Sequence, residues 1–229
     1  MILPFLTTYH KALLYFEGTD TSTTFTDQSG KTWTAAGNAQ MDTAQRKFGG
    51  ASGLFDGTGD VITTPDHADW NFATGDCRIS LFARWNALPS SGVTQYLINQ
   101  YVSGGANRWL LLLANSAGTY SLQFIVTTGG ADTITITGTV VISTGVWYRV
   151  ILSRIGTSFV IYLDAISKGA GTDSDTIADY AAVLAVGARG SDNGQAFNGW
   201  LDVLEVMKGF AYTAVQERRM QAWLTGRLM

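Results

Sequence analysis

The chain has 229 residues, of which 46% are hydrophobic and only 14% are charged, and its formal net charge at pH 7 is −3. This length fits one large domain with a substantial buried core. The small negative charge provides no broad attraction to nucleic acid or to an anionic membrane surface, so we expect neither as a partner.

Residues 1–12 form an apolar N-terminal segment that we expect to act as a docking element. The segment lacks the basic start of a signal peptide, and Pro4 interrupts its apolar run. No run in the chain approaches the ~18 apolar residues needed to span a membrane. Extended apolar stretches such as Ile2–Leu6 can add a strand to a sheet or fill a groove on a partner protein.

Short runs rich in β-branched and aromatic residues occupy much of 13–212, with Gly, Asn, Asp and Ser clusters between them. The predicted strands cover 13–18, 24–27, 31–34, 95–101, 108–114, 120–127, 133–142, 148–155, 158–163, 183–187 and 201–207. Strands at this spacing predict an antiparallel sandwich or barrel.

Two of these runs carry more detailed information. Residues 158–163 alternate, which places Phe159, Ile161 and Leu163 on one face of a strand. Residues 110–113 are continuously apolar, so we expect that strand to be covered on both sides or to lie under a loop.

Cys77, the only cysteine, lies in another strand-like run. A single cysteine excludes an intramolecular disulfide and a zinc site built on paired cysteines. We interpret Cys77 as a small buried hydrophobic residue.

The end of the chain, 213–229, has the spacing of an amphipathic helix. Its pattern residues recur at intervals of three and four: Gln216, Met220, Trp223, Leu224 and Leu228. We expect this short C-terminal helix to pack on or near the sandwich, and a docking role for a partner chain is the alternative.

Four signatures occur in a fixed order between Phe55 and Met207. They are FDGTGDVI at 55–62, GDCRISLF at 75–82, TGVWYRV at 144–150 continuing to IYLD at 161–164, and LAVG at 184–187 followed by NGWLDV at 198–203. This order resembles the laminin-G-like, concanavalin A-like lectin/glucanase superfamily. The resemblance implies a two-sheet antiparallel jelly-roll sandwich, whose members are mostly lectins, adhesion modules and glycan hydrolases.

The same resemblance allows the hydrolase alternative to be examined. Retaining glycosidases on this fold resemble one another in a motif whose two carboxylates flank the scissile bond about 5 Å apart. The nearest match is WLDVLE at 200–205, where Trp200 occupies the nucleophile position. Asp202 and Glu205 fall on opposite faces of a regular strand unless a bulge intervenes. We therefore predict a protein without catalytic activity.

Sugar binding requires an aromatic face for the apolar side of the ring and planar polar groups for its hydroxyls. Tyr101, Asn107, Arg108 and Trp109 bracket a Gly-rich loop and form the first candidate site. Trp70 and Asn71, in the run DWNF at 69–72, form a second candidate group. We expect Trp70 and Trp109 to contact water, whereas Trp33, Trp85 and Trp147 lie in strand-like runs and are expected in the core.

Calcium is the one metal that the sequence offers. The resemblance implies a rim site made of Asp or Asn side chains and loop carbonyls, which suit a hard cation. Asp192 and Asn193 are the first candidates, and Asp56 and Asp60 the second. The alternative interpretation is that all four residues form turns.

These observations predict a non-catalytic module that binds cell-surface glycans. The openings LLYFEGTD at 13–20 and KFGGAS at 47–52 look most like those of phage-encoded structural and adhesion proteins. We therefore expect a virion surface location, with contacts to other virion proteins through the N-terminal segment or the C-terminal helix. A homo-oligomer is also compatible with the sequence. The alternative is a decoration or tail protein that makes only protein contacts.

Overall fold

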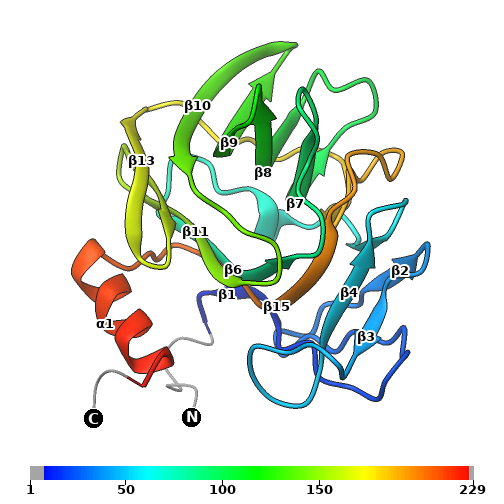
Figure 1. Ribbon diagram of the computed structural model, residues 1–229. Coiled ribbons are helices and arrows are strands. Elements are labelled where there is room, and N and C mark those ends of the chain that lie inside the picture. Colours follow the sequence, from blue (N-terminus) through cyan, green and yellow to red (C-terminus); the bar gives the residue numbers. More distant parts are fainter. Residues whose placement is uncertain (1–7, 227–229) are drawn as a thin grey trace.

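Two antiparallel sheets packed face to face make up most of the fold (Figure 1), which is taken from a computed structural model that describes residues 8–226. The eight-stranded sheet has the order β13 (Ile166–Thr172), β12 (Ser158–Leu163), β11 (Trp147–Ile155), β6 (Cys77–Trp85), β15 (Asn198–Lys208), β4 (Ser52–Asp56) and β3 (Gln40–Asp42), with β1 (His10–Leu14) paired to β15. The seven-stranded sheet has the order β10 (Ala131–Val140), β9 (Thr119–Thr128), β8 (Arg108–Ser116), β7 (Thr94–Tyr101), β14 (Leu184–Val186), β5 (Val61–Thr64) and β2 (Thr34–Ala36). The predicted jelly-roll sandwich is confirmed.

The core lies between the two sheets, and strand alternation decides which side chains enter it. Phe159, Ile161 and Leu163 of β12 are buried there, as their alternating pattern predicts. Cys77 is fully buried as well, and burial raises the pKa of its thiol to about 12. It is therefore the small hydrophobic residue that the sequence indicates.

The continuously apolar run in β8 is covered on both sides. Leu111 and Leu113 belong to the central core, whereas Leu110 and Leu112 belong to a separate cluster. All four side chains are at most 3% exposed. This outcome matches the expectation for residues 110–113, with Leu110 and Leu112 packed beside Tyr96 on the outer face of the seven-stranded sheet.

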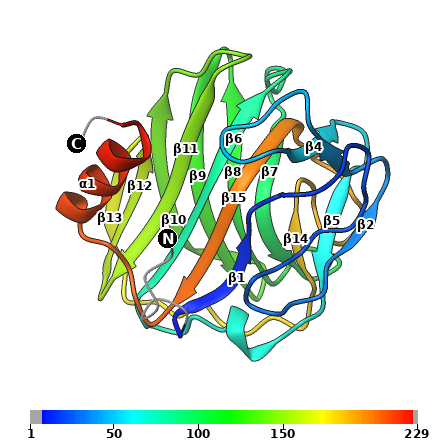
Figure 2. The ribbon, with the colours of Figure 1, turned by 90° about the horizontal axis from the view of Figure 1, so that it is seen from below.

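The predicted C-terminal helix is confirmed, whereas the first strand begins earlier than predicted. The strand β1 begins at His10, inside the segment that we assigned to docking, while Ile2–Leu6 lies outside the described residues. The helix α1 (Ala214–Leu224) begins after the N-cap residue Thr213 and runs beside the eight-stranded sheet (Figure 2). None of the helices within 8–226 is long and apolar enough to cross a membrane.

The helix buries a different face from the one that its apolar pattern predicts. Glu217 is its fully buried residue, whereas Trp223 is 61% exposed. The reason is electrostatic: Glu217 accepts from Arg78 of β6, and Arg149 of β11 lies 3.3 Å away from the same carboxylate. Leu228 lies outside the described residues.

Candidate functional site

A line of four outward-facing residues crosses one end of the seven-stranded sheet. The pairing register places Tyr101 opposite Arg108, Arg108 opposite Thr127, and Thr127 opposite Asp132. Antiparallel partners point to the same side of a sheet. Because Trp109, next to Arg108, points into the core, all four face outward.

The polar contacts along this line fix the Arg108 guanidinium. Its Nη1 donates to the carbonyl oxygen of Gly105 at 2.9 Å, and its Nη2 lies 3.6 Å from Asp132 Oδ1. Thr127 Oγ1 donates to the same carboxylate oxygen at 2.6 Å. The Arg108 guanidinium carbon lies 5.5 Å from the centroid of the Tyr101 ring, within the range of a cation–π contact.

The loop between β14 and β15 adds a second arginine to the same ring. The Arg189 guanidinium carbon lies 5.3 Å from the Tyr101 centroid. Arg189 Nε donates to Asp192 Oδ1 at 2.7 Å, and the Gly194 N–H donates to the same oxygen at 3.0 Å. These two hydrogen bonds lower the pKa of Asp192, so the carboxylate is ionised at neutral pH.

The loop is anchored over the sheet by a buried amide. Asn99 of β7 is fully buried; it donates to the Ala188 carbonyl at 2.8 Å and accepts from the Gly190 N–H at 3.1 Å. Farther along, the Tyr96 N–H donates to the Gln195 carbonyl at 2.9 Å. The loop therefore has a fixed position from which Arg189 reaches Tyr101.

Beneath the polar groups is an apolar layer on the outer face. Tyr96, Leu110 and Leu112 are buried in it, and Tyr101, Ala114 and Ile125 are partly exposed. The result is a partly exposed tyrosine flanked by two guanidinium groups and two carboxylates, beside apolar side chains. This combination has the chemistry that sugar recognition requires. We call Tyr101, Arg108, Arg189, Asp132 and Asp192 the Tyr101 rim.

The sequence prediction for this site is wrong about the exposure of its tryptophans. Trp109 is fully buried, and its indole N–H donates to Gln100 Oε1 at 3.2 Å. Trp70 is fully buried too, with its indole N–H on the Pro65 carbonyl. Both rings fill the core, so neither face is presented to a ligand in this structure.

Of the other predicted residues, Asn107 links two loops at the same end of the sheet. Its Oδ1 accepts the Gly129 N–H at 3.0 Å, in the turn between β9 and β10. Tyr101 and Arg108 are in contact, as their positions around the loop indicate. The sequence prediction of the sugar site does not include Arg189, because only the folding of the loop between β14 and β15 brings this residue to Tyr101.

Of the predicted calcium residues, Asp192 and Asn193 lie in a turn and a bend, whereas Asp56 ends β4 and Asp60 precedes β5. No group of three or more His, Cys, Asp or Glu side chains is placed to hold a metal ion anywhere in residues 8–226. Asp60 is buried and accepts the backbone N–H groups of Asn38 and Asp56, and burial raises its pKa. The backbone N–H of Asn193 donates to the Arg189 carbonyl at 2.9 Å. The calcium hypothesis for Asp192 and Asn193 stays a prediction.

A bulge does interrupt β15 between Asp202 and Glu205, with Val203 at a φ of 44°. Its core-facing neighbours Leu201 and Leu204 leave both carboxylates on the outer face of the eight-stranded sheet. Each carboxylate serves a structural contact there. Asp202 accepts the Lys47 and Phe48 N–H groups, and Glu205 accepts from Arg78.

The protein is thus a jelly-roll sandwich that carries an aromatic ring, guanidinium groups and carboxylates together on the outer face of one sheet. The family model described as the concanavalin A-like lectin/glucanases superfamily matches residues 56–212, and the chain belongs to this family. No protein with a curated description matches the sequence.

Several solved structures share the fold. Domain 4 of AbnA, an extracellular GH43 arabinanase from Geobacillus stearothermophilus, in complex with arabinotriose, has a TM-score of 0.67 at 19% identity. The match covers 93% of this chain and 98% of that domain.

The binding domain of Paraclostridial Mosquitocidal Protein 1 has a TM-score of 0.70 at 14% identity, with coverage of 95% and 53%. The ligand-binding domain of botulinum neurotoxin serotype D, in complex with N-acetylneuraminic acid, has a TM-score of 0.67 at 12% identity, with coverage of 99% and 53%. The chain spans about half the length of these two toxin structures.

Proposed function

We propose that this protein is a non-catalytic glycan-binding module whose ligand contacts the Tyr101 rim. The observation that carries the proposal is that the guanidinium carbons of Arg108 and Arg189 lie 5.5 Å and 5.3 Å from the centroid of the partly exposed Tyr101 ring. A sugar ring can stack its apolar face on a tyrosine while guanidinium and carboxylate groups bind its hydroxyls. Similar domains whose structures contain arabinotriose or N-acetylneuraminic acid support a carbohydrate ligand.

The engagement of the carboxylates near the family's motif position supports a non-catalytic role. Trp200 cannot act as the nucleophile of a retaining glycosidase. Asp202 is fully buried against the backbone of residues 47 and 48. Glu205 is held by Arg78 at 2.6 Å. These contacts favour binding over hydrolysis.

A glycan array on the purified protein tests the proposal, with Tyr101→Ala as the site variant and Trp223→Ala as the matched control. Both changes remove one aromatic ring that is at least partly exposed, but Trp223 lies on α1. We expect the wild type and the control to bind the same glycans and Tyr101→Ala to lose at least about tenfold in affinity. Equal binding by all three proteins would place the ligand elsewhere.

A structural role is the second candidate, and the outer side of α1 favours it. Trp223 is 61% exposed and Val215 is 50% exposed on this helix. Together with the phage-like sequence openings, these residues fit a virion protein that docks on its neighbours through α1 or the N-terminal segment. Deletion of residues 1–10, or Trp223→Ala, would then prevent incorporation into particles. Normal incorporation of both variants would contradict this role.

A further inference from the structure

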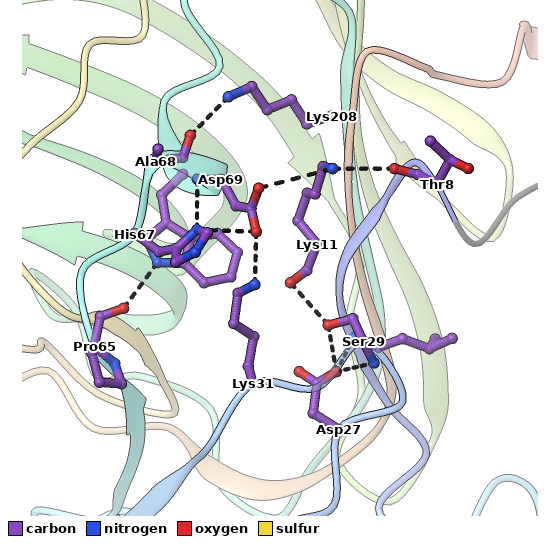
Figure 3. A network of polar contacts seen from close by, with 12 residues as sticks. Thr8, Lys11, Asp27, Ser29, Lys31, Pro65, His67, Ala68, Asp69 and Lys208 are labelled. Carbon is purple, nitrogen blue, oxygen red and sulfur yellow. Dashed lines mark hydrogen bonds and ion pairs between the residues drawn. The ribbon is translucent and has the colours of Figure 1, made fainter.

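Three lysines, none of them part of the Tyr101 rim, lie close to Asp69 and Ala68 (Figure 3). Lys31 Nζ lies 2.7 Å from Asp69 Oδ2, and Lys11 Nζ lies 3.8 Å from Asp69 Oδ1. Lys208 Nζ donates to the carbonyl oxygen of Ala68, the preceding residue, at 2.7 Å. Two ammonium groups therefore flank the Asp69 carboxylate, and a third binds the carbonyl of the residue before it.

These groups come from separate parts of the chain. Lys11 belongs to β1, Lys31 precedes β2, and Lys208 ends β15, while Asp69 lies in the short helix η2 (Ala68–Trp70). Although burial opposes ionisation, the hydrogen bond and charge of Lys31 lower the pKa of Asp69. The fold thus holds this cluster together, and its local charge is positive in a chain whose net charge is −3.

The lysines retain hydrogen-bonding capacity. An ammonium group has three N–H donors. Within residues 8–226, Lys31 donates to Asp69, Lys11 donates to the Thr8 carbonyl, and Lys208 donates to Ala68. The second carboxylate drawn in Figure 3, Asp27, accepts from the Ser29 hydroxyl and from the Trp33 indole N–H. The remaining ammonium donors therefore suit an external oxyanion.

An exposed aromatic pair adjoins the cluster. Tyr9, which is 36% exposed, lies two residues before Lys11, and its carbonyl accepts the Lys208 N–H at 3.0 Å. The ring of Tyr9 lies 5.3 Å from that of Phe210, centroid to centroid. An aromatic face next to an oxyanion site suits a sugar that carries an acidic group, because the ring binds the apolar face while ammonium groups bind the anion.

We propose that Lys11, Lys31 and Lys208, together with Tyr9, form a second binding site that takes the carboxylate or sulfate group of an acidic glycan. This site is independent of the Tyr101 rim. Its ligand is a saccharide that carries negative charge. The net charge of −3 of the whole chain does not predict such a ligand.

Binding to heparin, a sulfated chain, and to polygalacturonate, a carboxylated chain, tests the proposal at low ionic strength. The site variant is Lys11→Gln/Lys208→Gln, which leaves Lys31 in place as the closest partner of Asp69. The matched control is Arg218→Gln/Arg219→Gln on the exposed side of α1, which lowers the net charge by the same amount. The variants Lys11→Gln and Lys208→Gln, made separately, replace the double variant if it fails to fold.

We expect the wild type to bind at least one of the two polymers and the site variant to lose about tenfold or more in affinity, with little change in the control. The polymer that binds identifies the anion. Binding of neither polymer, or an equal loss in the control, would overturn the proposal. Tyr9→Ala keeps every charge and should lower affinity for the same polymer; unchanged affinity would refute the aromatic contact. Tyr101→Ala should leave this binding intact, which separates it from the proposed function.

Discussion

Arg78 of β6 and Glu217 of α1 form a hydrogen-bonded ion pair in which both side chains are fully buried. The pair joins the helix to the eight-stranded sheet across 139 residues of sequence. Glu205 accepts from the other side of the same guanidinium at 2.6 Å, and His10 Nε2 lies 3.4 Å from Glu205. Although burial opposes ionisation, Arg78 and His10 lower the pKa of Glu205 to about 2.

Glu217→Ala should therefore destabilise the protein strongly, because it leaves the Arg78 charge buried without one of its two partners. Breaking a buried ion pair by removing one partner costs about 3–5 kcal/mol. Denaturant unfolding measures the loss, and Arg218→Ala, a change at the next and exposed residue, should alter stability by less than about 0.5 kcal/mol. A Glu217→Ala protein as stable as the wild type would show that the helix is not held by this pair.

The sequence pattern of 213–229 places the start of α1 to within one residue, since the helix begins at Ala214 after the N-cap Thr213. It fails on the buried face, because the partner of Glu217 is a charged residue on a strand far away in the sequence. Apolar periodicity reports only hydrophobic burial. No local signal marks a glutamate that an arginine will neutralise.

The tryptophans give the opposite lesson. Alternation in β8 was sufficient to place Trp109: if Arg108 faces outward, its neighbour must face the core. The prediction places both residues in the strand 108–114 but assigns both to one solvent-facing site, because they bracket a Gly-rich loop. The contact between Arg189 and Tyr101 is different in kind, because it depends on how the β14–β15 loop folds back and is not encoded in the spacing of either segment.

The titration of Asp202 should make the stability of the protein depend on pH. Burial raises its pKa from 3.8 to about 7, against the effect of the N–H groups that it accepts. The folded state then binds a proton that the unfolded state releases, so the free energy of unfolding falls as the pH rises from about 4 to about 7. The decrease is on the order of 4 kcal/mol.

Asp202→Asn should remove this decrease, since the amide does not titrate. Unfolding measured at pH 4.5 and at pH 8 checks the difference between the two conditions for each protein. Asp175→Asn, at an exposed position, should retain the wild-type difference. If Asp202→Asn retained it as well, another group would be responsible.

A substitution at Gly105 tests whether the positions of Tyr101 and Arg108 matter for glycan binding. Its φ is +76°, and a Cβ at this position would collide with the Tyr101 hydroxyl and the Arg108 guanidinium. Gly105→Ala should therefore displace both side chains and lower glycan affinity at least about tenfold, at a stability cost of about 1–2 kcal/mol.

Gly104→Ala is the control, because its φ is also positive but no atom lies within 4 Å of the added methyl group. It should show a similar strain cost without the loss of affinity. Equal affinity losses in the two variants would attribute the effect to the loop backbone and not to Tyr101 and Arg108. Isothermal titration with a glycan from the array, together with thermal melts, measures both quantities.

Asp192 separates the calcium hypothesis from a role in holding Arg189. Asp192→Asn keeps an acceptor for the Gly194 N–H but removes the charge that orients Arg189. We expect about five- to tenfold weaker glycan binding with little change in stability, because Asp192 is 53% exposed. Asn193→Gly removes the other predicted ligand while preserving the φ of 58° at that position, and it should bind normally. Affinity should be the same in calcium and in chelator. A calcium-dependent affinity that both variants abolish would instead establish a metal site, and Arg189 would then have to release Asp192 when the ion binds.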